Sequence, residues 1–109
     1  MSDGDTTPGT AGEAIQVRDD RVAGRFEILV DDVVAGYADY RDQPATGDAA
    51  GVRTFPHTVV EPEFGGRGLA GRMIGEALQA TRRDGLRVRA TCPFVARYIE
   101  KHPDAADLA

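Results

Sequence analysis

The segment Gly65–Gly71 (GGRGLAG) has glycine at four of its seven positions. It follows a strand-like stretch, Val52–Val60, and opens Gly68–Asp84, where apolar residues recur with helical spacing. Glycine allows close approach to the backbone, and the first N–H groups of a helix lack intrahelical partners and carry the positive end of its dipole. The segment therefore predicts an anion-binding loop to which Arg67 adds charge. The alternative is a glycine-rich turn that only starts a helix.

The order of elements predicts one α/β (α+β) domain. Strands are expected at Ala14–Arg18, Arg25–Val30, Val33–Tyr40, Val52–Val60 and Leu86–Ala90, and helices at Gly68–Asp84 and Pro93–Lys101. The early strands follow one another too closely for helical crossovers, so they must pair antiparallel. The first helix bridges two strands and gives one right-handed parallel crossover. We therefore expect a mixed, mostly antiparallel sheet with a βαβ crossover and a C-terminal helix.

The remaining segments predict turns and tails. Asp19–Asp20 is expected as a turn and Arg41–Gly51 as a loop. Residues 1–13 contain nothing that can bury surface and predict a disordered tail. The domain then covers residues 14–103, and residues 104–109 form a C-terminal tail.

One strand carries a proline and a histidine. Alternation along Val52–Val60 puts Phe55, His57 and Val59 on one face. Pro56 cannot donate a ladder hydrogen bond, so we expect it at a bulge or on the unpaired side.

Composition excludes several classes of protein. The net charge of −5 argues against a nucleic acid or acidic membrane partner. No apolar run approaches the ~20 residues of a membrane span, and the N-terminus lacks the features of a secretory signal. Cys92 is the only cysteine, so we expect no internal disulfide, no zinc site and no other metal, in a cytoplasmic protein.

The charge is distributed unevenly along the chain. Residues 1–62 carry a net −7, residues 63–102 a net +4, and residues 103–109 a net −2. The segment with the glycine loop is therefore basic, which suits a phosphate-rich ligand, although Arg82 and Arg83 are also typical of a solvated helix face.

Two common phosphate-binding motifs do not fit. Gly66, Gly68 and Gly71 spell G-x-G-x-x-G, but dinucleotide sites also need an acidic residue about 20 positions further on and a larger parallel sheet. Arg87 and Arg89 stand where the acid would be. A P-loop is excluded because no Gly-Lys-Ser/Thr follows.

The run Val59–Ala70 resembles instead the acyl-CoA pyrophosphate loop of the GCN5-related N-acetyltransferases, Gln/Arg-x-x-Gly-x-Gly/Ala. Gly68 and Ala70 match its last two fixed positions, and Gly65 stands where Gln or Arg is usual. The flanking FPHTVV (residues 55–60) and CPFVARYIEKHP (residues 92–103) are similar to the minimal branch of that superfamily. The resemblance covers residues 14–103 and implies a truncated acetyltransferase fold.

The resemblance implies that acetyl-CoA is the cosubstrate and lies in a V-shaped gap between the fourth and fifth strands. The pantetheine arm would follow the strand end, and the pyrophosphate would bind the loop N–H groups. The residues expected to hold the cofactor are Val59, Val60, Gly65, Gly66, Arg67, Gly68, Leu69 and Ala70.

The resemblance also brings Cys92 near the reactive thioester, and its position before a helix favours the thiolate. Cys92 would be an acetyl-accepting nucleophile or a group that orients or protonates the leaving thiolate, or else a buried small side chain. His57 would be the general base, or else a structural histidine. Tyr98 lies one position before the usual tyrosine acid and is expected to pack instead.

The sequence thus predicts an N-acetyltransferase acting on an amine, either a small molecule or a protein. Only a short connection joins Arg18 to Arg25, so the helices that build acceptor pockets in larger relatives are absent. The site would then be open and would be completed by a second subunit or by a macromolecular acceptor. The alternatives are a non-catalytic CoA- or acyl-CoA-binding module and, third, a small nucleotide-binding domain.

Overall fold

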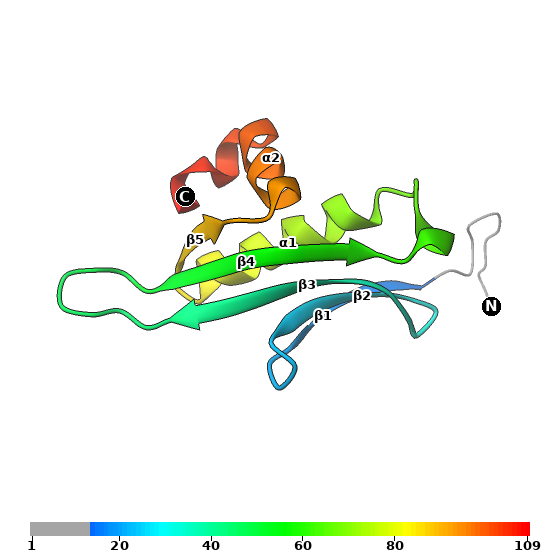
Figure 1. Cartoon of the computed structure of the whole chain (residues 1–109), viewed down its shortest axis with the longest axis horizontal. Coiled ribbons are helices and arrows are strands. Elements are labelled where there is room, and N and C mark those ends of the chain that lie inside the picture. Colours follow the sequence, from blue (N-terminus) through cyan, green and yellow to red (C-terminus); the bar gives the residue numbers. More distant parts are fainter. Residues whose placement is uncertain (1–13) are drawn as a thin grey trace, which may run out of the picture.

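The computed structural model describes residues 14–109, and the tail expected for residues 1–13 lies outside them. Within this range one sheet has the order β1-β2-β3-β4-β5 (Figure 1). Its strands are β1 Ile15–Asp20, β2 Arg25–Val30, β3 Val33–Gln43, β4 Val52–Val60 and β5 Arg87–Ala90, and its helices are α1 Leu69–Arg83 and α2 Pro93–Lys101. Neighbours from β1 to β4 are antiparallel, whereas β4 and β5 are parallel across α1. The expected mixed sheet with one βαβ crossover is confirmed.

Two strands are longer than expected. Asp19 and Asp20, expected as a turn, belong to β1, where the Tyr40 hydroxyl donates a hydrogen bond to Asp19 (2.6 Å). β3 runs on to Gln43, into the segment expected as a loop. A charged contact explains this extension, because Asp42 on β3 binds Arg53 on β4.

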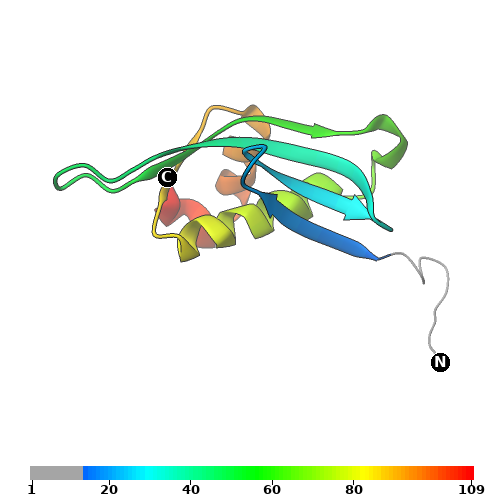
Figure 2. The same ribbon diagram turned by 90° about the horizontal axis from the view of Figure 1, so that it is seen from below.

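The core lies between the sheet and the helices. Figure 2 shows α1 beneath the sheet. The side chains buried there come from all layers: Phe26, Ile28, Ala38, Phe55, Met73, Ile74, Ala77, Val95 and Ile99. α2 packs on α1, and Tyr98 sits so close to Gly75 that a Cβ there would lie 2.7 Å from its hydroxyl. α1 thus packs against both the sheet and α2.

The C-terminal segment is not the tail that we expected at residues 104–109. A 3₁₀ helix spans Pro103–Leu108, and Ala105 and Leu108 are buried in the core. Arg82 of α1 donates to both Asp107 carboxylate oxygens (2.7 and 2.9 Å) and to the Asp104 carbonyl (2.8 Å). Two buried apolar side chains and this arginine clamp attach the segment to the domain.

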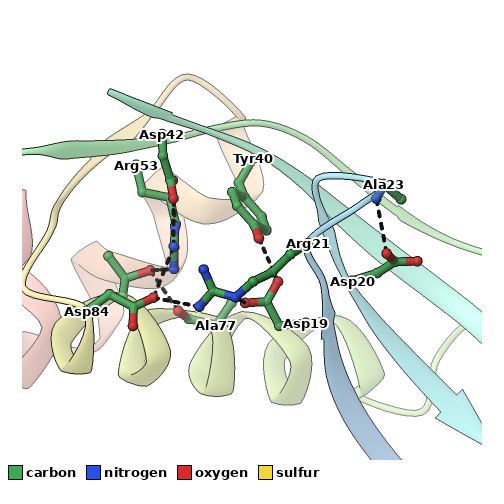
Figure 3. Close-up of polar contacts among 10 residues, drawn as sticks. Asp19, Asp20, Arg21, Ala23, Tyr40, Asp42, Arg53, Ala77 and Asp84 are labelled. Atoms are coloured by element: carbon green, nitrogen blue, oxygen red, sulfur yellow. Dashed lines mark hydrogen bonds and ion pairs between the residues drawn. The ribbon is translucent and has the colours of Figure 1, made fainter. Parts of the chain in front are cut away.

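The buried Arg53 connects the end of β3 and the start of β4 to the C-terminal end of α1 (Figure 3). Arg53 is 0% exposed and donates to both oxygens of Asp42 (2.7 and 2.8 Å) and to Asp84 (3.1 Å). Its guanidinium also lies 4.5 Å from the centre of the Tyr40 ring. Burial and the Asp19 carboxylate raise the pKa of Tyr40 to about 12. This cluster is structural and lies at the far end of α1 from the glycine loop.

Candidate functional site

The glycine run turns the chain from β4 into α1. Gly66 and Gly68 have φ angles of 75° and 72°, in the left-handed region that a Cβ disfavours. Gly68 caps α1, and its carbonyl accepts the first helical hydrogen bond from Arg72 (3.2 Å). The N–H groups of residues 69–71 therefore have no partner within the helix. No heavy atom lies within 4 Å of where a Cβ would stand on Gly66 or Gly68, so the loop is open to a ligand.

A hollow of about 350 Å³ lies over this loop. Its walls are Val60, Phe64, Gly65, Gly66, Arg67, Gly68, Leu69, Ala70, Gly71 and Phe94. They include every residue predicted to hold the cofactor except Val59. The end of β4, the glycine loop and the start of α2 thus form one continuous surface, and the Arg67 guanidinium lies over the Phe64 ring, 5.8 Å from its centre.

The strands β4 and β5 separate beside this hollow. They pair from Val52 with Arg87 to Phe55 with Ala90. The last backbone hydrogen bond between the two segments runs from the Cys92 N–H to the Phe55 carbonyl (3.0 Å), just before α2 begins. The remainder of β4 therefore has an edge with no strand beside it.

Backbone geometry shows which residues face that open edge. The Glu61 N–H donates to Ala35 of β3 (2.8 Å), and the Val59 carbonyl points at β3, where a Cβ on Gly36 would lie 2.6 Å from it. Because backbone polar groups alternate in direction along a strand, those of Thr58 and Val60 point into the gap. The N–H and carbonyl of Val60 are therefore available to a ligand, whereas the backbone of Val59 faces β3 within the sheet.

A β-bulge changes the faces of β4. Asp39 of β3 pairs with His57, but Arg41 pairs with Thr54, so two residues of β4, Phe55 and Pro56, oppose a single residue of β3. The expectation that Pro56 lies at a bulge is confirmed. The bulge shifts the alternation of side chains for the rest of the strand.

His57 consequently does not share a face with Phe55, as simple alternation predicted. Phe55 is fully buried under the sheet, and Thr58 is on that same side because it pairs with the fully buried Ala38. His57 and Val59 lie on the outer face, away from α1. There the exposed His57 ring lies 6.2 Å from the ring of Tyr37.

Thr58, which the sequence did not indicate, contacts Cys92. The Cys92 Sγ lies 3.4 Å from the Thr58 Oγ1. Cys92 is 6% exposed and caps the N-terminus of α2, with Pro93 as the first helical residue. The two residues predicted to be catalytic therefore lie on opposite sides of the sheet, with Cys92 inside and His57 outside. The bulge proline was the available signal for this change of face.

The surroundings of Cys92 favour its thiolate. Burial alone would raise the pKa of the thiol, but hydrogen bonds from the Thr58 hydroxyl and from the backbone of Val95, Phe94 and Thr58 together lower it below its ordinary value. Two of these amides belong to the first turn of α2, where the helix dipole also favours negative charge. The thiol at the N-cap of α2 therefore ionises more readily than an ordinary cysteine.

Tyr98 packs, as expected. It lies against α1 at Gly75, and its ring stacks on that of His102 with 3.8 Å between centres. Burial, and then the nearby Asp104, raise the pKa of Tyr98.

Within residues 14–109, no group of three or more His, Cys, Asp or Glu side chains is placed to hold a metal ion. No helix in that same range is long and apolar enough to cross a bilayer.

A mixed sheet that opens between β4 and β5, with a glycine loop that caps the crossover helix, is the arrangement of acetyltransferase folds. The family described as GCN5-related N-acetyl-transferase matches residues 25–108, and the chain belongs to it. No curated protein matches the chain in sequence.

Solved structures share this fold at low identity. A GCN5-like protein from Staphylococcus aureus is 20% identical, with a TM-score of 0.61 over 85% of each chain. An acetyltransferase from Trypanosoma brucei is 23% identical, with a TM-score of 0.57 over 74% of this chain and 62% of its own. The aminoglycoside acetyltransferase AAC(6')-Iy, bound to a bisubstrate analogue of CoA and acetylneamine, is 23% identical, with a TM-score of 0.52 over 74% and 58%. The chain thus spans about six-tenths of the length of the last two.

Proposed function

We propose that the protein is an acetyl-CoA-dependent N-acetyltransferase that loads Cys92 and passes the acetyl group to an amine. The observation that carries this proposal is the continuity of the loop hollow with the open edge of β4, where the Cys92 thiol is held. Acetyl-CoA would lie with its pyrophosphate on the N–H groups of Gly66–Ala70. Its pantetheine arm would pair with the backbone of Val60. The CoA-bound fold relative supports this choice of cosubstrate.

The lowered pKa of Cys92 supports a nucleophile rather than an acid. A thiolate has no proton to donate, but it can attack the thioester carbon. The new bond from Sγ to the acetyl carbon forms as the bond from that carbon to the CoA sulfur breaks, and CoA leaves as a thiolate that takes a proton from water. The small exposed fraction of Cys92 restricts this reaction to a ligand that enters the gap.

The amine acceptor would approach along the open edge of β4, which joins the outer face where His57 lies to the inner side where Cys92 is held. The connection from β1 to β2 is only residues 21–24, so no helix covers this face between those strands. His57 would take the proton that the amine loses as nitrogen attacks the acetyl-thioester and the Cys92 thiolate is regenerated. An uncovered acceptor face suits a protein amine or a site completed by a second copy.

Intact mass after incubation with acetyl-CoA tests the proposal. We expect one added acetyl group in the parent protein, none in Cys92→Ala, and loss of the label with CoA release when an amine is added. CoA binding without loading or turnover on any amine would instead identify a non-catalytic binding module. Binding of NADH without CoA, measured by calorimetry, would overturn the assignment of the loop.

A further inference from the structure

The strand β1 forms one edge of the sheet, because within residues 14–109 it pairs only with β2. The Ala14 carbonyl accepts a hydrogen bond from the N–H of Asp31 at the end of β2 (2.9 Å). Because backbone polar groups alternate in direction along a strand, those of Ile15, Val17 and Asp19 point away from β2. These three residues offer both their N–H and carbonyl groups to a further strand.

The two edges of the sheet differ in how well they are protected against such pairing. β5 is only four residues long, and two of them are the exposed Arg87 and Arg89. β1 is six residues long, contains no proline or lysine, and pairs with β2 without a bulge. Its arginine, Arg18, reaches across the sheet to Glu27 of β2 (2.7 Å). β1 therefore lacks the features that keep an edge strand from pairing with another chain.

A groove of about 350 Å³ lies between this edge and α1. The apolar residues that line it are Val17, Phe26 and Ala80. Arg21 also lines the groove and links Asp19 of β1 (3.2 Å) to Asp84 after α1 (3.3 Å) (Figure 3). A molecule that adds a strand to β1 therefore also meets the side of α1.

The α1 residues beside the groove form a self-complementary row. Glu76, Ala80 and Arg83 follow one another at helical spacing on the face that lines the groove. Within residues 14–109 Arg83 makes no ion pair, and Glu76 makes an exposed one with Arg72 of the same helix (3.5 Å). A row with an acid at one end, a small residue in the middle and a base at the other matches its own copy turned by 180°. Such self-complementarity is the property of a two-fold interface.

We infer that the β1 edge binds the β1 edge of a second copy of this chain, antiparallel, with Val17 opposite Val17. This register also pairs Ile15 of each copy with Asp19 of the other, so every outward-facing residue of β1 has a counterpart. The two-fold axis is perpendicular to the sheet and keeps both copies of α1 on the same face. Because Val17 and Ala80 line the same groove, the axis passes between the two Ala80 residues. Glu76 of each copy then lies opposite Arg83 of the other.

The pairing leaves the candidate site uncovered. β1 and β4 are separated in the sheet by β2 and β3, so the glycine loop and the open edge of β4 lie away from the axis. Association through β1 and binding of CoA should therefore be independent, and the inference does not rest on the proposed function.

Sedimentation velocity at increasing protein concentration tests the pairing. We expect the parent protein to form dimers, and Val17→Pro to stay monomeric at concentrations where the parent is dimeric. Proline at this position removes an N–H that points outward and leaves the hydrogen bonds to β2 in place. A parent protein that is monomeric at every concentration, or a dimer that persists in folded Val17→Pro, would overturn the inference.

Charge reversal on α1 tests the register in variants that keep β1 unchanged. Glu76→Arg and Arg83→Glu each put like charges across the axis and should weaken the dimer by about tenfold. The combined variant Glu76→Arg/Arg83→Glu restores opposite charges and should bring the dissociation constant back to within about twofold of the parent value. Arg41→Glu, an equal change of charge at an exposed residue of β3 outside the groove, should leave the dimer unchanged. Equal dissociation constants in the parent and all of these variants would exclude the contact between the two copies of α1 and overturn the register.

Discussion

The thiol of Cys92 and the hydroxyl of Thr58 face each other where β4 leaves β5, with 3.4 Å between Sγ and Oγ1. Thr58 reaches this position only because the bulge at Pro56 brings it to the inner face of the sheet. The hydroxyl donates to the sulfur when the thiol is ionised, and this contact is the largest of those that lower the pKa of Cys92. A residue of β4 thus lowers the pKa of the thiol at the N-cap of α2.

Thr58→Val should raise the pKa of Cys92, because it removes the hydrogen bond that does most to lower it. The rate of Cys92 acetylation falls as the pH drops through the pKa of the thiol, since only the thiolate attacks. The midpoint of that profile should therefore move to higher pH in the variant. Thiolate absorbance and intact mass across pH measure both effects.

Thr54→Val is the matched control, because Thr54 lies on the same strand before the bulge, half-buried and without contact to Cys92. Its midpoint should equal that of the parent protein. An unshifted midpoint in Thr58→Val would show that the backbone amides alone hold the thiolate.

Gly68 and Gly71 of the loop should respond differently to substitution by alanine. Gly68→Ala puts a Cβ on a residue with φ of 72° and should lower the free energy of unfolding by about 1 kcal/mol. Gly71→Ala lies inside α1 with open space around it and should raise that free energy by about 0.5 kcal/mol. Urea unfolding compares the two.

Gly68→Val carries a larger backbone cost, because valine is β-branched, and adds bulk where the phosphates would approach the N–H groups. Its CoA affinity should be lost while the circular dichroism spectrum persists. Affinity equal to that of the parent in a folded Gly68→Val protein would contradict the loop assignment.

His57→Gln should separate the two half-reactions. His57 lies on the outer face, without contact to the Cys92 thiol, so acetyl loading from CoA should proceed at the parent rate. Transfer from acetylated Cys92 to an amine should slow by about a hundredfold, the lower range for loss of a general base. Single-turnover mass measurements follow both steps, and equal slowing of loading and transfer would exclude His57 as the base for the amine.

The sequence predicted the parts of the fold that depend on local chemistry. The glycine run, the helix after it and Pro93 at the start of α2 are each specified by residues close together in the chain, and the structure has them. Pro56 also predicted a bulge. The extra residues of β1 and β3 could not be predicted, because Asp19 and Asp42 favour turns locally and are held in strands by Tyr40 and Arg53, which lie far along the chain.

In the candidate site, too, the features that depend on nearby residues could be predicted and those that depend on distant residues could not. Most residues of the loop hollow lie close together in sequence and were predicted to hold the cofactor, whereas Phe64, Gly71 and Phe94 were not. The contact of Thr58 with Cys92 joins residues that are 34 positions apart, and it forms only because the bulge turns Thr58 to the inner face of the sheet. Alternation alone therefore assigned the wrong face to His57 and gave no signal for Thr58.

Arg53→Met should lower the free energy of unfolding by about 2–3 kcal/mol. The change leaves Asp42 and Asp84 without their common partner, and the cost is reduced because each carboxylate is about a third exposed. Arg41→Met, on the neighbouring strand and exposed, should change it by less than about 0.5 kcal/mol. CoA affinity should be the same in both variants, since the cluster lies away from the glycine loop. A stability loss no larger than that of Arg41→Met would show that the cluster contributes little.

Leu108→Ala tests whether the C-terminal segment belongs to the domain. Leu108 is 6% exposed, and truncating a buried leucine costs about 2–3 kcal/mol at a site that can partly relax. Asp107→Ala removes only an exposed ion pair with Arg82, so it should lower the free energy of unfolding much less than Leu108→Ala does. Urea unfolding of the two variants gives the comparison. A tail would leave both unchanged, whereas a packed 3₁₀ helix requires that Leu108→Ala be clearly the more damaging of two adjacent substitutions.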